Sequence, residues 1–265
     1  MNLFQLSLLL ALLGTAFADI DGLKIEKKGK FGSKSFRINY KGKDGSTLSP
    51  WHDIPLKSED GKYYNMVIEI PKMTREKMEI STKEKNNPIA QDLKKGKVRN
   101  YPGPIFWNYG CIPQTWEDPT ELHPTMKVIG DNDPIDLVEI GTAQIPMGAV
   151  KEVKVLGALA MIDDGELDWK VIVVDKDNEL AQKYNDIYDV PEIVKNGIRE
   201  WFRWYKTPDG KPLNEFGLGE KYITAKQAIA IIEETHVAWK KLKAGITDPA
   251  KLWVGNLDES LASEL

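Results

Sequence analysis

The sequence predicts a mainly β protein in which strands come first and helices come last. Short apolar or alternating runs separated by Gly, Pro, Asn and Asp fill most of the chain after residue 19, and such runs are typical of strands. Helical periodicity appears only towards the C-terminal end, and strands and helices do not alternate as they do in a parallel α/β sheet. We therefore expect a closed or sandwiched β core with helices packed on it.

Six segments are expected to form strands. Phe36 to Tyr40 alternates between apolar and polar residues and ends at a Lys-Gly-Lys-Asp-Gly turn. The other segments are residues 65–70, 77–82, 135–140, 152–159 and 169–174.

Two segments are expected to form helices. Residues 191–205 have a helical apolar stripe, and Pro191 suits the first helical position. Residues 224–242 repeat the pattern, and both stripes predict packing on the core. No linker divides the chain, so residues 19–265 are expected to form a single domain.

Composition excludes several classes of protein. The 265 residues carry 36 Lys+Arg against 40 Asp+Glu, and 42% are hydrophobic, which is an ordinary balance for a globular chain and gives no reason to expect a nucleic-acid partner. The one cysteine, Cys111, excludes an intramolecular disulfide and is expected to be a small buried residue. The three histidines lack the spacing of zinc ligands.

The N-terminal residues 1–18 resemble a signal peptide. They contain no charged side chain, and the apolar run from Leu3 to Leu13 is followed by Ala16-Phe17-Ala18, a small-x-small cleavage signature. A membrane anchor is the alternative, but the run is shorter than the roughly 20 apolar residues of a spanning helix. We expect cleavage before Asp19, no membrane association afterwards, and a place in the secretory pathway, either secreted or in an organelle lumen.

Three aspartates fall close together in residues 130–137. Asp131 and Asp133 would share one face of an extended strand, and the break at Pro134 would let Asp136 turn towards the same point. Two carboxylates about 5 Å apart repel by roughly 3 kcal/mol at an effective dielectric constant near 20, so a partly buried cluster needs cations or protons. The alternative is a solvated acidic loop. An EF-hand is excluded because the glycine and glutamate that it requires are absent.

A second acidic group lies in residues 161–170. The Asp164-Gly165 dipeptide between two apolar runs predicts a hairpin turn, with Asp163 and Asp168 on opposite arms and Lys170 on the face of Asp168. An acidic hairpin tip at the surface is the alternative.

Other segments supply mixed charge. Glu69 interrupts an apolar strand, and Lys77 and Glu79 share one face of the next strand, which is also compatible with a solvated face. Arg99, Tyr109, Tyr205 and Lys206 follow. Carboxylates suit hard cations, and Lys, Arg and Tyr donors suit phosphate oxygens, so together they indicate metal-assisted phosphoryl chemistry.

The segment Asp131-Asn132-Asp133-Pro134-Ile135-Asp136-Leu137 resembles the Asp-x-Asp-Pro-x-Asp signature of soluble family I inorganic pyrophosphatases. Further segments of the chain agree with the eukaryotic branch of this family in the correct order, over about residues 36–245. They are Ser49-Pro50-Trp51-His52-Asp53-Ile54-Pro55-Leu56, Val67-Ile68-Glu69-Ile70-Pro71, Pro113-Gln114-Thr115-Trp116-Glu117-Asp118-Pro119, Glu200-Trp201-Phe202 and Tyr205-Lys206.

The resemblance implies a fold, an activity and a set of roles. It implies a five-stranded OB-like β-barrel core flanked by two main C-terminal helices, a homodimer, and Mg²⁺-dependent hydrolysis of inorganic diphosphate to two orthophosphates by a metal-activated hydroxide. The implied general base is Asp133. The implied metal ligands are Asp131, Asp136, Asp168, Asp163, Glu79 and, through water, Glu69. The implied substrate-binding residues are Lys77, Arg99, Tyr109, Lys170, Tyr205 and Lys206.

One segment departs from the family pattern. Between Arg99 and Asn108 the chain is about five residues shorter than typical eukaryotic members, and Ile105 replaces a tyrosine that is often assigned as proton donor. The segment also retains one of two arginines, and Tyr101 is a candidate substitute for the missing tyrosine. Two other functions stay open: a pyrophosphatase-like scaffold subunit with impaired catalysis, and a hydrolase of other phosphoanhydrides.

Overall fold

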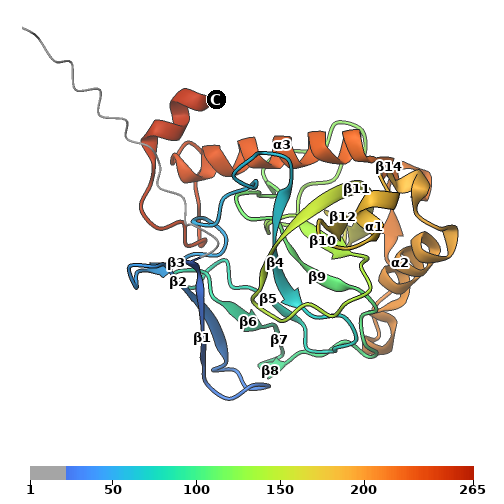
Figure 1. Cartoon of the computed structure of the whole chain (residues 1–265), viewed down its shortest axis with the longest axis horizontal. Helices are drawn as coiled ribbons and strands as arrows, with labels where there is room; N and C mark the ends of the chain where they lie inside the picture. The colour runs from blue at the N-terminus through green and yellow to red at the C-terminus, as the bar shows by residue number, and fades with distance from the viewer. Residues whose placement is uncertain (1–21) are drawn as a thin grey trace, which may run out of the picture.

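Five strands close into a ring at the centre of the molecule (Figure 1). They run in the order β12 (Glu166–Asp175), β10 (Asp136–Glu139), β9 (Asn108–Cys111), β4 (Tyr64–Ile70) and β11 (Val150–Asp163), which pairs again with β12. The β10–β12 pair is parallel and the other pairs are antiparallel. The closed five-stranded core predicted for the chain is confirmed.

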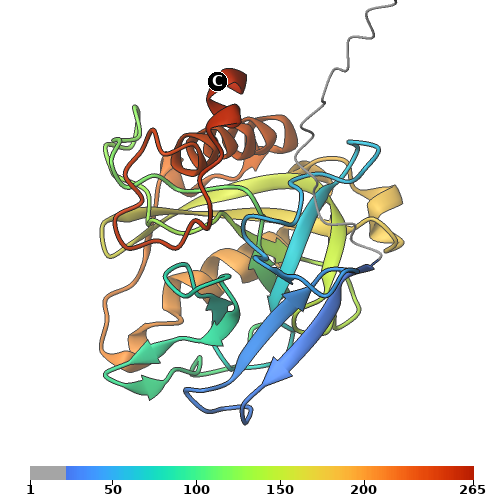
Figure 2. The ribbon, with the colours of Figure 1, turned by 90° about the vertical axis from the view of Figure 1, so that its left-hand side faces the viewer.

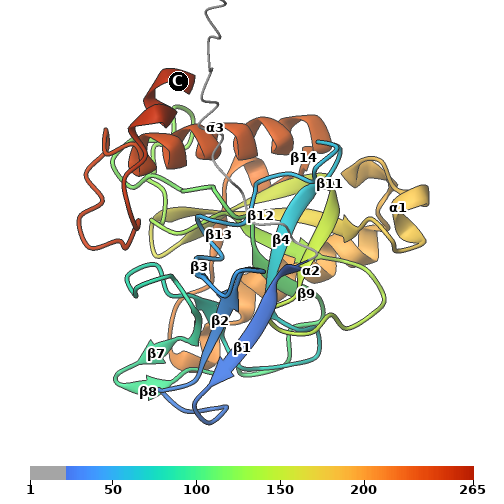
Figure 3. The ribbon, with the colours of Figure 1, turned by 60° about the vertical axis from the view of Figure 1, so that its left-hand side comes forward.

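A second, smaller sheet lies beside the ring. Its strands are β1 (Lys24–Lys28), β2 (Arg37–Lys41), β6 (Ile89–Gln91) and β5 (Met78–Ile80), with β3 (Thr47–Leu48) paired to β2. A short hairpin of β7 (Leu93–Lys94) and β8 (Lys97–Val98) follows β6. Figures 1 and 3 place β1, β2 and this hairpin on the side of the ring away from α3.

Both predicted helices are present. Helix α3 (Ala225–Lys243) begins after Thr224, whose side chain accepts a hydrogen bond from the Gln227 backbone in a capping box. Helix α2 (Glu192–Trp204) begins after Pro191. Pro191 is the N-cap residue, one position before the first helical position that the sequence predicted for it. The short helix α1 (Leu180–Lys183) and the 3₁₀ turns η2 (Ile187–Asp189), η3 (Thr207–Asp209), η4 (Leu218–Glu220) and η5 (Glu259–Glu264) complete the helical part. Strands β13 (Glu215–Phe216) and β14 (Ile223–Thr224) pair with β11.

The helices cover the ring from two sides. Ala228 and Ile232 of α3 are fully buried against strand residues of β11 and β12, whereas Ile198 and Phe202 of α2 join the other core cluster. Figure 2 shows the long strands between the two helices. The apolar stripes predicted from the sequence therefore pack on the β core, as expected.

The structure, a computed structural model, describes residues 22–265. The predicted signal peptide at residues 1–18 lies outside the described residues. Between residues 22 and 265, no helix combines the length and the apolar character needed to cross a membrane.

Candidate active site

One pocket of about 420 Å³ collects every side chain for which the sequence predicted a role. All five ring strands, the β5 strand of the second sheet and the segment after α2 contribute to its wall. The predicted residues that line it are Glu69, Lys77, Glu79, Arg99, Tyr109, Asp131, Asp133, Asp136, Asp163, Asp168, Lys170, Tyr205 and Lys206. The structure therefore brings the residues together, while the role of each stays a prediction.

A tight loop, not a strand, carries the first two aspartates. Asn132 has a left-handed backbone (φ 72°), and strand β10 begins only at Asp136. Glu117 anchors the loop through its backbone: its N–H donates to Asp133 and its carbonyl accepts from Asn132, both over 2.9 Å. A Cβ on Gly130 would come within 2.5 Å of the Glu117 carbonyl, so this close approach requires glycine. The predicted extended strand at Asp131 and Asp133 is wrong, because the backbone of Asn132 and Asp133 bonds to Glu117 and not to a strand.

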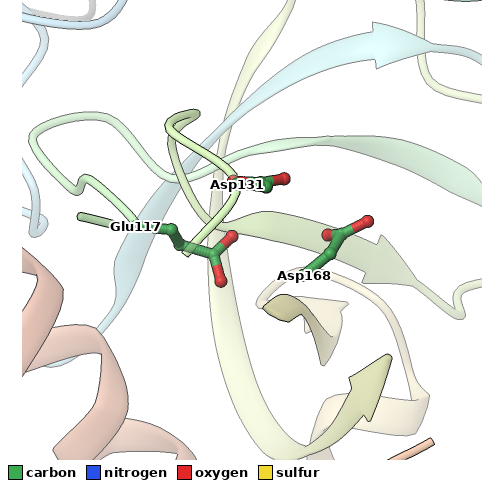
Figure 4. Close-up of side chains that lie close together, drawn as sticks. All are labelled: Glu117, Asp131 and Asp168. Carbon is green, nitrogen blue, oxygen red and sulfur yellow. The ribbon is translucent and has the colours of Figure 1, made fainter. Parts of the chain in front are cut away.

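Three carboxylates form the most compact group in the pocket wall. Oxygen atoms of Glu117, Asp131 and Asp168 lie within 4.8 Å of one another, and Figure 4 shows them reaching together from three separate segments. One oxygen of Glu117 accepts from the Trp169 N–H over 3.0 Å, whereas the other is buried without a hydrogen-bond partner. Because an orphaned buried oxygen beside two more carboxylates is a suitable ligand set for a hard divalent cation, the residues fit a metal ion here.

The protonation of these carboxyl groups reflects their crowding. Burial, followed by the charge of Asp168, raises the pKa of Glu117 well above its usual value. Burial likewise raises the pKa of Asp131 strongly and that of Asp168 to about 7. These acids therefore retain protons near neutral pH until a cation takes the place of the protons.

The sequence analysis did not select Glu117 as a site residue. It lies in the segment Trp116-Glu117-Asp118-Pro119, which served only as evidence for the family resemblance. The local signal was weak because Glu117 reaches the other acids through a loop, whereas the pattern rules apply to strands and helices.

A buried lysine connects two of the predicted ligands. The Lys170 ammonium lies 2.5 Å from carboxylate oxygens of Asp136 and Asp168 and donates to the Tyr109 hydroxyl over 2.9 Å, and Tyr109 itself donates to Asp136. Burial lowers the pKa of Lys170, but the charges of the two aspartates outweigh it and raise the pKa well above the usual value. Lys170 therefore stays charged and holds both carboxylates in place.

The predicted hairpin that carries this group is confirmed. Asp164 and Gly165 form the two-residue turn between β11 and β12, and both have positive φ, as the favoured hairpin turns require. Asp163 and Asp168 lie on opposite arms, and Lys170 contacts Asp168 as predicted.

Glu69 and Asp133 occupy the part of the pocket that faces the second sheet. The pairing of β4 with β9 shifts register between Ile68 and Ile70, which is a bulge centred on Glu69. Its carboxylate accepts from the Ile80 N–H over 2.6 Å, and burial raises its pKa strongly. Burial, assisted by nearby negative charges, raises the pKa of Asp133 to about 7.

The positive side chains on the second-sheet side already have acidic partners. The Lys77 ammonium lies 2.6 Å from Glu79 and 3.2 Å from Asp92, and the Arg99 guanidinium lies 2.9 Å from Asp92. Asp92, which the sequence analysis did not select, keeps the two cations side by side at the pocket wall.

A similar arrangement follows α2. The Lys206 ammonium pairs with Asp163, and the Tyr205 hydroxyl donates to the same carboxylate over 3.1 Å. Tyr205 and Lys206 are thereby fixed to the β11 arm of the hairpin.

The segment that departs from the family pattern places its two candidate residues differently. Ile105 is fully buried in the apolar core and does not line the pocket. Tyr101 does line it. Cys111 is a buried free thiol, as expected, and burial raises its pKa strongly.

A closed β core with clustered carboxylates opposite paired Lys and Arg side chains defines the class of metal-assisted phosphoanhydride hydrolases. Comparison with known proteins narrows this class. A family model described as inorganic pyrophosphatase matches residues 66–240. The chain therefore belongs to the inorganic pyrophosphatase family, and the predicted family is confirmed.

Individual relatives agree over most of the chain. Soluble inorganic pyrophosphatase 6, chloroplastic, of Arabidopsis thaliana is 46% identical over 234 residues, which cover 87% of this chain and 78% of that protein. The crystal structure of type I inorganic pyrophosphatase from Toxoplasma gondii is 45% identical with a TM-score of 0.79, covering 83% of this chain and 99% of that one. An N-terminally truncated Trypanosoma cruzi vacuolar soluble pyrophosphatase in complex with PPi is 38% identical with a TM-score of 0.82, covering 92% of this chain and 98% of that one.

Proposed function

We propose that this chain is an inorganic diphosphatase that hydrolyses diphosphate to two orthophosphates with the help of divalent metal ions, and that Mg²⁺ is the ion it uses. The observation that carries the proposal is the group of Glu117, Asp131 and Asp168, whose oxygens converge within 4.8 Å and include a buried oxygen without a partner. The complex of the T. cruzi relative with PPi supports the choice of substrate.

The acidic residues would hold the metal ions. Asp131, Asp168 and Glu117 form the most compact set, and Asp136 lies beside them through Lys170. The predicted ligands Asp163, Glu79 and Glu69 line other parts of the same wall. A bound divalent ion lowers the pKa of a coordinated water, so that hydroxide is available near neutral pH.

Asp133 is suited to take a proton at neutral pH. Its carboxyl group lies at the pocket wall, and its pKa of about 7 is close to the optimum for a general base. The Thr82 hydroxyl donates to one of its oxygens over 3.4 Å.

The cationic side would bind the phosphate oxygens. Lys77, Arg99 and Lys206 are lining residues whose charges attract anions, and each of them pairs with a carboxylate that fixes its position. Tyr109 and Lys170 act further back, because they orient Asp136.

Orthophosphate release by the purified protein tests the function. With diphosphate and Mg²⁺ we expect turnover that a chelator abolishes and that added Mg²⁺ restores. No turnover at saturating Mg²⁺ would refute the proposal in favour of a scaffold subunit. Faster release from short polyphosphate or a nucleotide than from diphosphate would favour a hydrolase of other phosphoanhydrides.

We further propose the homodimer and the secretory location that the sequence analysis predicted. Light scattering of the purified chain measures its mass and would contradict the dimer if it gave that of a single chain.

N-terminal sequencing of the native protein tests the signal peptide: a start at Asp19 supports cleavage, whereas an intact Met1 contradicts it. Two relatives carry chloroplastic and vacuolar in their names. Recovery of the native protein from an organelle outside the secretory pathway would contradict the proposed location.

A further inference from the structure

Three tyrosines line the pocket, and one of them has an uncommitted hydroxyl. Tyr109 donates to Asp136, and Tyr205 donates to Asp163. The hydroxyl of Tyr101 makes no hydrogen bond within the part of the chain that the structure describes, although only 3% of this residue is exposed. This hydroxyl is not among the buried side-chain atoms that lack a partner, so it opens to the pocket and is available to a ligand that enters there.

The Tyr101 side chain is held firmly in position. Its backbone N–H donates to the Arg75 carbonyl over 2.7 Å, and the Arg75 guanidinium donates back to the Tyr101 carbonyl over 3.0 Å. The ring packs edge-on against Trp201 and Tyr205, with centroid distances of 4.9 and 5.6 Å. These contacts fix the phenol before any ligand binds, so a hydrogen bond from it costs little conformational entropy.

The surroundings of the hydroxyl suit an anionic ligand. Burial raises the pKa of Tyr101, and the nearby charges of Lys77, Lys170 and Arg99 oppose that rise without cancelling it. The hydroxyl therefore remains a proton donor at neutral pH, and the same cations attract an anion towards it.

We propose that Tyr101 contacts the substrate and that its hydroxyl donates a hydrogen bond to a phosphate oxygen of bound diphosphate, beside Lys77 and Arg99. This inference rests on the proposed function. Ile105, four residues further along, is fully buried in the core and offers no donor, so Tyr101 supplies the phenol of this segment.

Tyr101→Phe tests the inference because it keeps the ring and removes the hydroxyl. A lost hydrogen bond to a charged group predicts a fall of about 10- to 100-fold in kcat/KM, together with a similarly weaker affinity for imidodiphosphate, a diphosphate analogue with a nitrogen bridge. The melting temperature should stay unchanged, since the hydroxyl has no partner within the protein. Tyr64→Phe is the matched control: Tyr64 donates to Glu233 over 2.6 Å outside the pocket, so this variant should keep kcat/KM.

The possible outcomes separate cleanly. Unchanged kcat/KM and analogue affinity in Tyr101→Phe would overturn the inference, and so would a lower melting temperature with unchanged kinetics, which would assign Tyr101 to packing alone. If the unaltered protein fails to release orthophosphate, the proposed function is refuted. The inference about Tyr101 is then tested by binding alone: imidodiphosphate should bind more weakly to Tyr101→Phe than to the unaltered protein.

Discussion

The two sides of the pocket balance their charges differently. On the acidic side, which we define as Glu69, Glu117, Asp131, Asp133, Asp136 and Asp168, burial raises the pKa of most carboxyl groups, and Lys170 pairs with only two of them. On the donor side, which we define as Lys77, Arg99, Tyr205 and Lys206, every member already contacts a carboxylate.

This difference separates two binding events. The acidic side has more carboxylates than Lys170 can neutralise and needs cations from solution. The donor side already has its partners, and we expect it to exchange a carboxylate for a phosphate oxygen when substrate binds. Variants on the acidic side should therefore change metal affinity or the chemical step, and variants on the donor side should change substrate binding. The predictions below test this division.

The largest effect is expected for Asp133→Asn. An amide cannot take the proton that the proposed base removes, so kcat should fall by roughly 10²- to 10⁴-fold, while Mg²⁺ binding persists. Steady-state kinetics with a Mg²⁺ titration measure both quantities. Asp175→Asn, which alters an ion pair with Lys151 away from the pocket, is the control, and unaltered turnover in Asp133→Asn would refute the assigned role.

A smaller effect is expected for Glu117→Gln. The variant keeps the shape but removes the charge beside the orphaned oxygen, so Mg²⁺ affinity should fall by about 10- to 100-fold. Fluorescence of Trp116 and Trp169, the first of which adjoins Glu117 and the second of which donates to it, follows metal binding without substrate.

Glu139→Gln is the matched control for Glu117→Gln. Glu139 is equally buried, but its oxygens accept hydrogen bonds from Asn108, Gly141 and Asp175 outside the pocket. It should keep the metal affinity even if it loses stability. Equal metal affinities in the two variants would remove Glu117 from the site.

On the donor side, Lys206→Ala should mainly raise KM. Loss of one charged contact to phosphate predicts about a tenfold increase with a smaller change in kcat. The neighbouring exposed Lys211, which pairs with Asp164, provides the comparison. If Lys211→Ala raises KM as much, the general charge of the pocket mouth explains the effect and the specific role of Lys206 is wrong.

The smallest effect is expected in stability against pH. Asp133 and Asp168 have a pKa of about 7 when folded against 3.8 as the reference, so the folded protein holds protons that the unfolded chain has already lost. The metal-free protein should therefore lose stability as pH rises through this window. Mg²⁺ displaces these protons, so its stabilisation should grow over the same range, to about 5–10 °C in melting temperature. A metal effect that does not depend on pH would contradict the raised pKa values.

Much of the fold was predictable because periodicity is a local property. The long strands around residues 65–70 and 152–159, and both helices, were placed correctly since burial of one face leaves a regular pattern. The closure of the ring by β11 and β12 was predictable only from the hairpin turn and the resemblance. The strands β1, β7 and β8 were missed because they are exposed and have little apolar pattern. The buried strands β6 and β9 were missed because runs of three and four residues are too short to show a period.

The candidate site was predictable where acids lie in strands or beside a turn. Asp163, Asp168 and Lys170 follow from one hairpin register. Glu117 and Asp92 were missed because their positions depend on contacts between segments distant in the sequence. The backbone of Glu117 sets the loop of Asp131 and Asp133, which no rule of strand alternation describes.

The ammonium of Lys170 has a consequence for the metal-free state of the protein. The ammonium between Asp136 and Asp168 is a permanent counterion, which holds the two carboxylates near each other without a divalent ion. Binding of metal ions then requires little rearrangement of the β-ring. The rise of activity with magnesium concentration should therefore follow the fraction of protein that has metal bound, without a separate conformational step.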